Sequence, residues 1–193
     1  MIYFKILPMT SVMGKYILIY FTILIMMLLI TLILTFLLLI IFYQDWKSRA
    51  VWWPLFPMVF LIQCYRSIHV LGFNDFLLFL AMNLGILLMQ LTVLYFYFAI
   101  KQKEMKIPLF KQYLGWGDVL LFLFLTTAFS PLNFVLFVMS GLILSLFLFL
   151  IIRKKSKTIP LAGILAAEYV IFIWVTKFYL DLNPYVELIP ITP

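Results

Sequence analysis

The stretch from Tyr16 to Tyr43, YILIYFTILIMMLLITLILTFLLLIIFY, contains 28 consecutive residues without a charged side chain. Crossing the hydrocarbon core of a bilayer, about 30 Å thick, takes about 20 residues of α-helix. The stretch therefore predicts a first transmembrane helix. It is much longer than the apolar core of a secretory signal peptide, about 7 to 15 residues, so we interpret it as a retained span and not as a cleaved leader.

The rest of the chain has the same apolar character. Of its 193 residues, 67% are hydrophobic and 11% are charged, and the mean hydropathy is +1.20. A soluble domain is about half apolar and a quarter charged, so no water-soluble fold could bury this much apolar surface. Because backbone groups in lipid must be hydrogen-bonded internally, we predict an all-α membrane protein. Residues 1–193 are expected to form a single transmembrane domain, a bundle of about six helices.

Five further spans follow when the apolar runs are measured against the length needed to cross a bilayer. The run 119–152 has 34 residues without a charge, too many for one untilted span. Ser130, Pro131 and Asn133 predict a turn that divides this run in two. The predicted spans are approximately 16–43, 51–65, 76–100, 119–129, 133–152 and 159–180.

The basic residues indicate the orientation of this bundle. The net charge is +7, and with six spans ten of the 14 lysines and arginines fall in three loops on one membrane face. These are Lys47 and Arg49; Lys101, Lys103, Lys106 and Lys111; and Arg153, Lys154, Lys155 and Lys157. The positive-inside rule makes this face cytoplasmic and predicts a multi-pass protein of the inner (cytoplasmic) membrane with both termini outside. We expect no nucleic-acid partner, because the basic residues form no soluble patch.

Acidic residues within a membrane span cost enough free energy that each is a functional candidate. Four of the seven acids fall in loops or external segments: Asp75, Glu104, Asp181 and Glu187. Three remain, namely Asp45 at the end of the first span, Asp118 at the start of the fourth, and Glu168 within the sixth.

Asp45 and Asp118 are expected to lie at the same, cytoplasmic boundary. Taken singly, Asp45 could pair with Lys47 or Arg49, and Asp118 could cap a helix. As a pair they are what acid and base catalysis on an amide requires. Gly115 and Gly117, just before Asp118, favour close approach of the backbone, which a cap alone does not need. Four of the five tryptophans flank the two acids, as expected at headgroup level: Trp46, Trp52, Trp53 and Trp116.

The chemistry expected of such a pair is that of aspartic proteases. Two carboxyl groups share one proton; the ionised one deprotonates a water molecule and the protonated one polarises the scissile carbonyl. No nucleophilic side chain or cofactor is needed. The only cysteine, Cys64, and the only histidine, His69, belong to the opposite end of the bundle, so neither a Cys/His mechanism nor a metal site is expected.

The segments 45–51, 115–119 and 157–163 together resemble the type IV prepilin and preflagellin peptidases, six-span aspartyl proteases of the GxGD class. Gly115-Trp116-Gly117-Asp118-Val119 is similar to the GxGD motif at the start of the fourth helix of that family. Asp45-Trp46-Lys47-Ser48-Arg49-Ala50-Val51 is similar to its first motif, an aspartate that closes the first helix. Lys157-Thr158-Ile159-Pro160-Leu161-Ala162-Gly163 is similar to the proline-containing start of its last helix.

The resemblance implies an endopeptidase that cleaves the short basic leader of a pilin-like precursor at the cytoplasmic membrane face, as in type IV pilus assembly and secretion. Asp45 and Asp118 would be catalytic, supported by Gly115 and Gly117, and no metal would take part. The partners would be the lipid bilayer and a pilin-like or other single-span substrate. The chain departs from the family in having Val51-Trp52-Trp53 where Ile-Pro-Asn is usual, and it lacks the four-cysteine loop of longer members.

Glu168 has no part in that resemblance. It falls nine residues into the predicted sixth span, near the middle of the membrane. The simpler interpretation is a protonated or paired carboxyl group that faces Asn83, Gln90 or Thr126 and Thr127 inside the bundle. The functional alternative is a contact with a polar group on a substrate helix.

Two other functions stay open on the sequence. One is a non-enzymatic membrane protein, a small transporter or assembly factor, with a paired-aspartate ion site at Asp45 and Asp118. The other is a GxGD protease whose transmembrane substrates are not pilins.

Overall fold

The structure, a computed structural model, describes residues 9–103, 114–152, 160–180 and 183–186. Within these ranges the chain is helical and has no strand, which confirms the predicted all-α class. The elements are α1 (Met9–Ser48), α2 (Leu55–Leu71), α3 (Phe73–Gln102), α5 (Trp116–Leu125), α6 (Pro131–Ile152), α7 (Leu161–Val175) and the π-helical η1 (Thr176–Leu180). Several residues assigned from the sequence lie outside the described ranges, among them Glu104, Lys106, Lys111, the cluster Arg153 to Lys157, Asp181 and Glu187.

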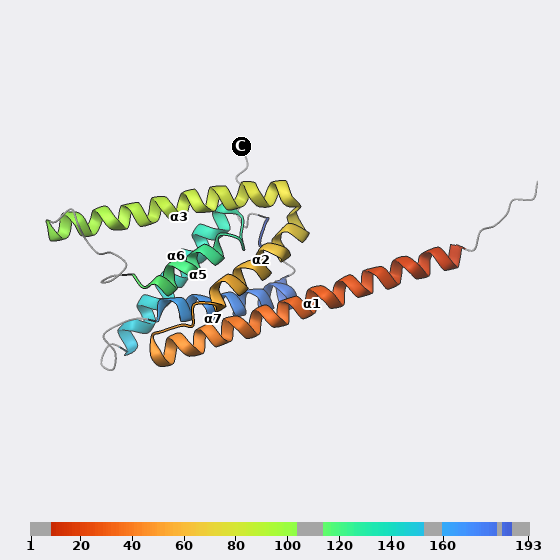
Figure 1. Cartoon of the computed structure of the whole chain (residues 1–193), viewed down its shortest axis with the longest axis horizontal. Coiled ribbons are helices and arrows are strands. Elements are labelled where there is room, and N and C mark those ends of the chain that lie inside the picture. The colour runs from red at the N-terminus through yellow and green to blue at the C-terminus, as the bar shows by residue number, and fades with distance from the viewer. Residues whose placement is uncertain (1–8, 104–113, 153–159, 181–182, 187–193) are drawn as a thin grey trace, which may run out of the picture.

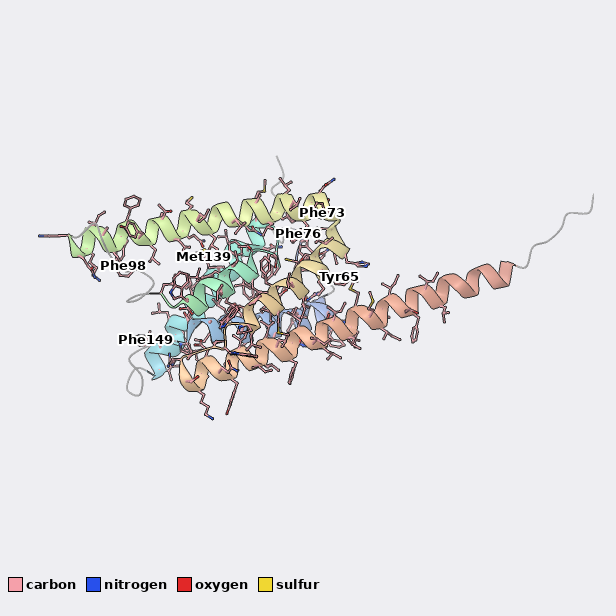
Figure 2. The ribbon with its side chains drawn as sticks, in the orientation of Figure 1. Tyr65, Phe73, Phe76, Phe98, Met139 and Phe149 are labelled. Carbon is pink, nitrogen blue, oxygen red and sulfur yellow. The ribbon has the colours of Figure 1, made fainter. Side chains whose placement is uncertain are left out.

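Four segments are long and apolar enough to cross a membrane: Phe21–Ser48, Phe73–Gln102, Pro131–Ile151 and Leu161–Phe178. The other two described helices, α2 and α5, are apolar but shorter, with 17 and 10 residues. Many large apolar side chains are exposed on the outside of the bundle, for example Phe73 at the start of α3 (Figure 2). The chain is therefore a multi-pass membrane protein whose apolar outer surface is suited to lipid.

The helices lie side by side and alternate in direction (Figure 1). The ends of α1, α3 and α6 and the starts of α2, α5 and α7 all point toward one end of the bundle, on the left in Figure 1. Helix α1 packs along α7 and α2, α3 contacts α2 and α6, and the short α5 lies against α2 and α7. This order brings the end of α1 and the starts of α5 and α7 to the same end of the bundle.

Several helix boundaries differ from the sequence expectation, among them the end of α1 and both ends of α2. The helix predicted to close near Tyr43 continues to Ser48, and Arg49 ends it with a φ of 55°. Helix α2 starts at Leu55, after Pro54, because proline at a helix start loses no hydrogen bond, and the ring of Pro57 fits the first turn. It then runs past Tyr65 to Leu71, where Gly72, with a φ of 81°, separates it from α3.

Helix α5 ends inside the bundle, at Leu125, and the chain turns before α6 begins at Pro131. Irregular backbone at membrane depth needs protein partners for its polar groups, because lipid offers none. Asn83 of α3 supplies two of them: its Nδ2 donates to the carbonyl oxygens of Thr126 at 2.9 Å and Phe129 at 2.8 Å. Ser67 of α2 donates to the Thr127 carbonyl oxygen at 2.6 Å. The turn predicted from Ser130 and Pro131 is thus held by side chains of two other helices.

The segment 183–186 packs against the same turn. The Pro184 carbonyl oxygen accepts hydrogen bonds from the Ser130 N–H at 3.2 Å and from Asn133 Nδ2 at 2.9 Å. The Tyr185 side chain is buried, with its hydroxyl 2.6 Å from Ser67 Oγ. Burial raises the pKa of Tyr185, so its hydroxyl stays neutral and available for these hydrogen bonds.

We expect Asn83→Leu to destabilise the protein by about 2 to 6 kcal/mol, because two buried carbonyl oxygens lose their donor and each such loss costs about 1 to 3 kcal/mol. Thermal unfolding in detergent measures the effect. The matched control is Thr92→Ala on the same helix, whose hydroxyl makes only a local bond to the Leu88 carbonyl oxygen at an exposed position. Equal melting temperatures for the two variants would contradict the role assigned to Asn83.

Candidate functional site

Asp45 lies in the last turn of α1 and its side chain is buried, with 8% of its surface exposed. Its Oδ2 accepts a hydrogen bond of 2.6 Å from the backbone N–H of Gly163, near the start of α7. Lys47, one of the two cations considered as its partner, instead places its Nζ 3.2 Å from the Tyr43 hydroxyl and over the Tyr43 ring. Asp45 is therefore directed into the bundle, toward α7.

Asp118 lies in the first turn of α5 and both of its carboxylate oxygens accept backbone hydrogen bonds. Oδ2 accepts the N–H of Gly115 at 3.1 Å, so Asp118 does cap its own helix. Oδ1 accepts the N–H of Ala162, on α7, at 2.8 Å. The capping interpretation thus describes only one of the two oxygen atoms, and the other joins α5 to α7.

The start of α7 is what the two aspartates share. Their carboxylates accept hydrogen bonds from consecutive amides, those of Ala162 and Gly163. The first N–H groups of a helix have no partner within the helix, and the helix dipole gives that end a partial positive charge, so it attracts carboxylates. Helix α7 begins after Pro160, whose carbonyl oxygen accepts the first backbone bond, from the Ile164 N–H at 3.0 Å.

Two glycines of the site leave space for these carboxylates. A Cβ atom at Gly163 would meet Asp45 Oδ2 at 3.1 Å, Asp45 Cβ at 3.2 Å and the Phe42 carbonyl oxygen at 3.3 Å. A Cβ atom at Gly115 would meet Asp118 Oδ2 at 3.2 Å. At Gly117 the added atom would make only ordinary contact, 3.5 Å from the Phe56 ring of α2. Close approach therefore favours glycine at 163 and at 115.

The surroundings of the pair are partly open. Asp118 is partly exposed, and the four tryptophans that flank the pair in sequence are all exposed: Trp46, Trp52, Trp53 and Trp116. Such amphipathic rings are typical of the level where lipid headgroups meet water. A pair of carboxyl groups at this level can exchange protons with a water molecule, as the two-carboxylate chemistry requires.

Glu168 does not join the aspartates and does not have the partners expected of it. Its Oε1 accepts a hydrogen bond of 2.7 Å from Ser140 of α6. Asn83 and Thr126, two of the residues predicted to face it, bond instead to each other, through the Asn83 amide and the Thr126 carbonyl oxygen. The carboxyl group is thus part of an α6–α7 contact.

The sequence identified both aspartates but not the amides that join them. Backbone N–H groups leave no mark in a residue pattern, although a proline at a helix start with alanine and glycine two and three residues later, as at Pro160, Ala162 and Gly163, is a usable signal for such a site. Within the described residues no three His, Cys, Asp or Glu side chains come together in a way that could hold a metal ion.

Comparison with known proteins adds no further indication: no family model, no curated protein and no solved structure matches this chain.

Proposed function

We propose that the chain is an intramembrane aspartyl endopeptidase of the prepilin-peptidase type, with Asp45 and Asp118 as its catalytic pair. The observation that supports the proposal best is the approach of two carboxylates from different helices to consecutive amides of α7. The three sequence segments that resemble the family also support it, because each of them contributes residues to this one site.

In the proposed reaction one carboxylate removes a proton from a water molecule while the water oxygen bonds to the scissile carbonyl carbon. The other carboxyl group donates its proton to the carbonyl oxygen, which gives a neutral tetrahedral diol. The carboxylate that is now ionised takes back one hydroxyl proton from the diol, the leaving nitrogen takes a proton from the carboxyl group that had removed it from water, and the C–N bond breaks, which leaves one proton on the pair as at the start. The amides of Ala162 and Gly163 keep the carboxyl groups oriented through the cycle, so little of the barrier is spent on positioning them.

Co-expression with candidate pilin-like precursors tests the proposal. We expect a precursor with a short basic leader to lose a few residues and shift on a gel. If no precursor shifts while the protein is inserted, the alternative function gains support, a non-enzymatic transporter or assembly factor that uses Asp45 and Asp118 to bind a cation or to hold α1, α5 and α7 together.

The proposed location is the inner (cytoplasmic) membrane, with the aspartate pair at the cytoplasmic face. In a Cys64→Ser background we expect a cysteine at Lys103, after α3, to react with an impermeant maleimide only after the cells are permeabilised. A cysteine at Asn74, in the first turn of α3, should react in intact cells and serves as the matched control. The opposite pattern would place the aspartates on the wrong face for cleavage of a cytoplasmic leader. Lys155, predicted to be on the same face as Lys103, lies outside the described residues.

A further inference from the structure

A pocket of about 490 Å³ lies between α6 and α7, on the part of α7 beyond the aspartate pair. Its walls are almost entirely apolar and include Leu136 and Phe137 of α6 and Ile171 and Phe172 of α7. Four polar residues also line it: Asn133, Ser140, Glu168 and Thr176. Ile171 is 63% exposed, so this wall of the pocket faces the surroundings of the bundle.

Within the described part of the chain, the Glu168 carboxyl group in this pocket has a single hydrogen-bond donor, the Ser140 hydroxyl. The Ser140 hydroxyl lies 2.7 Å from Glu168 Oε1 and 2.8 Å from the Phe137 carbonyl oxygen, so one hydroxyl proton serves two acceptors. The second carboxylate oxygen, Oε2, is buried against Gly141 of α6 and has no hydrogen-bond partner among the described residues, so Oε1 is the oxygen left to accept a further bond from the pocket. Each carboxylate oxygen can accept two hydrogen bonds. An acceptor-rich group at membrane depth is complementary to a partner that brings a donor.

The depth of Glu168 decides which kind of partner can supply that donor. Glu168 is five residues beyond Gly163 on α7, about 7.5 Å farther along the helix than the amide that binds Asp45. At that depth a lipid presents acyl chain, which has no hydrogen-bond donor. A transmembrane helix can present one there, as a serine, threonine or asparagine side chain.

We propose that the α6–α7 pocket is the docking site for the transmembrane helix of the substrate, and that Glu168 with Ser140 accepts a hydrogen bond from a polar side chain of that helix. This inference rests on the proposed function, because a leader cleaved at the aspartate pair is followed by an apolar helix that has to lie along the bundle. Helix α7 contributes to both places: its first amides hold the carboxylates and its later turns line the pocket. Residues of the substrate about five positions beyond the cleaved bond are the ones that reach Glu168.

Disulfide cross-linking with a synthetic single-span helix tests the inference. The probe has a short basic leader and a leucine–alanine helix of about 20 residues, with either serine or alanine about five residues into the helix and a cysteine one turn farther on. The protein carries Cys64→Ser, Ile171→Cys and Asp118→Asn, so that the probe is not consumed. We expect the serine probe to cross-link about three- to tenfold more than the alanine probe, the size of one hydrogen bond in a membrane.

Matched variants separate this contact from general adhesion. Glu168→Leu should remove the difference between the two probes, and Glu168→Gln should reduce it, because the amide replaces an acceptor by a donor. A cysteine at Leu88 of α3, which is 63% exposed but away from the pocket, should not distinguish the probes. Equal cross-linking of both probes at Ile171→Cys would overturn the proposal, as would a dominant disulfide between two copies of the protein, which would assign the pocket to self-association.

The outcomes also separate this inference from the proposed function. If Glu168→Leu does not change the cleavage of a precursor and cross-linking does not depend on the serine, the proposed protease function stands and the proposed docking site is refuted. If cross-linking depends on the serine but the protein cleaves no precursor, the helix-docking site stands and the proposed protease function is refuted.

Discussion

Asp45→Asn and Asp118→Asn are each expected to lower precursor cleavage at least about 10³-fold, because in the two-carboxylate reaction neither group can take over the role of the other. The double variant should be no worse than either single one, since residues that act as a unit do not contribute additively. Rates are measured by gel shift of a precursor with purified protein. Strong cleavage by either inserted variant would exclude the two-aspartate mechanism.

The two variants should differ in stability. In Asp45→Asn the new side chain can keep the hydrogen bond from the Gly163 amide through its own carbonyl oxygen, whereas both oxygens of Asp118 accept backbone N–H groups. In Asp118→Asn the new side chain places an NH₂ group against one of those donors. We therefore expect Asp118→Asn to melt at a lower temperature than Asp45→Asn, by the equivalent of about 1 to 3 kcal/mol. Equal stability would indicate that the contact to α5 or to α7 is dispensable.

Gly163→Ala is expected to reduce cleavage by about 10- to 100-fold while the protein remains folded. The added methyl group would meet the Asp45 side chain and the Phe42 carbonyl oxygen at 3.1 to 3.3 Å, so α1 and α7 must separate slightly. Displacement of a catalytic group by a fraction of an ångström to about 1 Å is enough for such a loss. The measurement is the cleavage rate, together with the melting temperature.

Gly85→Ala on α3 is the matched control for that substitution, because a Cβ atom there would have nothing within 4 Å. It should leave cleavage unchanged and stabilise the helix by up to about 1 kcal/mol, the usual difference between alanine and glycine in a helix. If Gly163→Ala behaves like Gly85→Ala, the close contact between Asp45 and the start of α7 is not needed for activity.

The fold class followed from the sequence because long uncharged runs have few structural solutions in lipid. The lengths of the helices were predicted from the sequence less accurately. Helix α1 extends beyond both ends of its predicted span. At its C-terminal end, the polar residues from Gln44 to Ser48 continue the helix instead of ending it. Helix α5 is shorter than expected from its apolar composition, since the Thr126 and Thr127 hydroxyls bond back to carbonyl oxygens of their own helix and the chain turns there. That competition between side chain and backbone is decided by Asn83 and Ser67, which are distant in sequence.

The two aspartates could be selected from the sequence because charge is rare in this chain and its depth can be read from the apolar runs. Their common contact with α7 could not be predicted from the sequence, because it depends on backbone amides and on how three helices pack. The hydrogen-bond partner of Glu168 also differs from the residues that the sequence suggested: these were polar residues of α3 and of the turn after α5, whereas the carboxyl group accepts a hydrogen bond from Ser140 of α6. When a helix is apolar on all sides, its hydrophobic pattern does not show which of its faces points toward which neighbouring helix.

The position of α7 in the chain sets the order in which this site can be completed during biosynthesis. The amide that binds Asp118 lies 44 residues after it, and the amide that binds Asp45 lies 118 residues after it. The ribosome synthesises the helices in order, so both aspartates enter the membrane well before the α7 amides that donate hydrogen bonds to them. The two aspartates therefore have no common contact until α7 is inserted. A truncated product that lacks α7 would contain both acids but not the arrangement that brings them together.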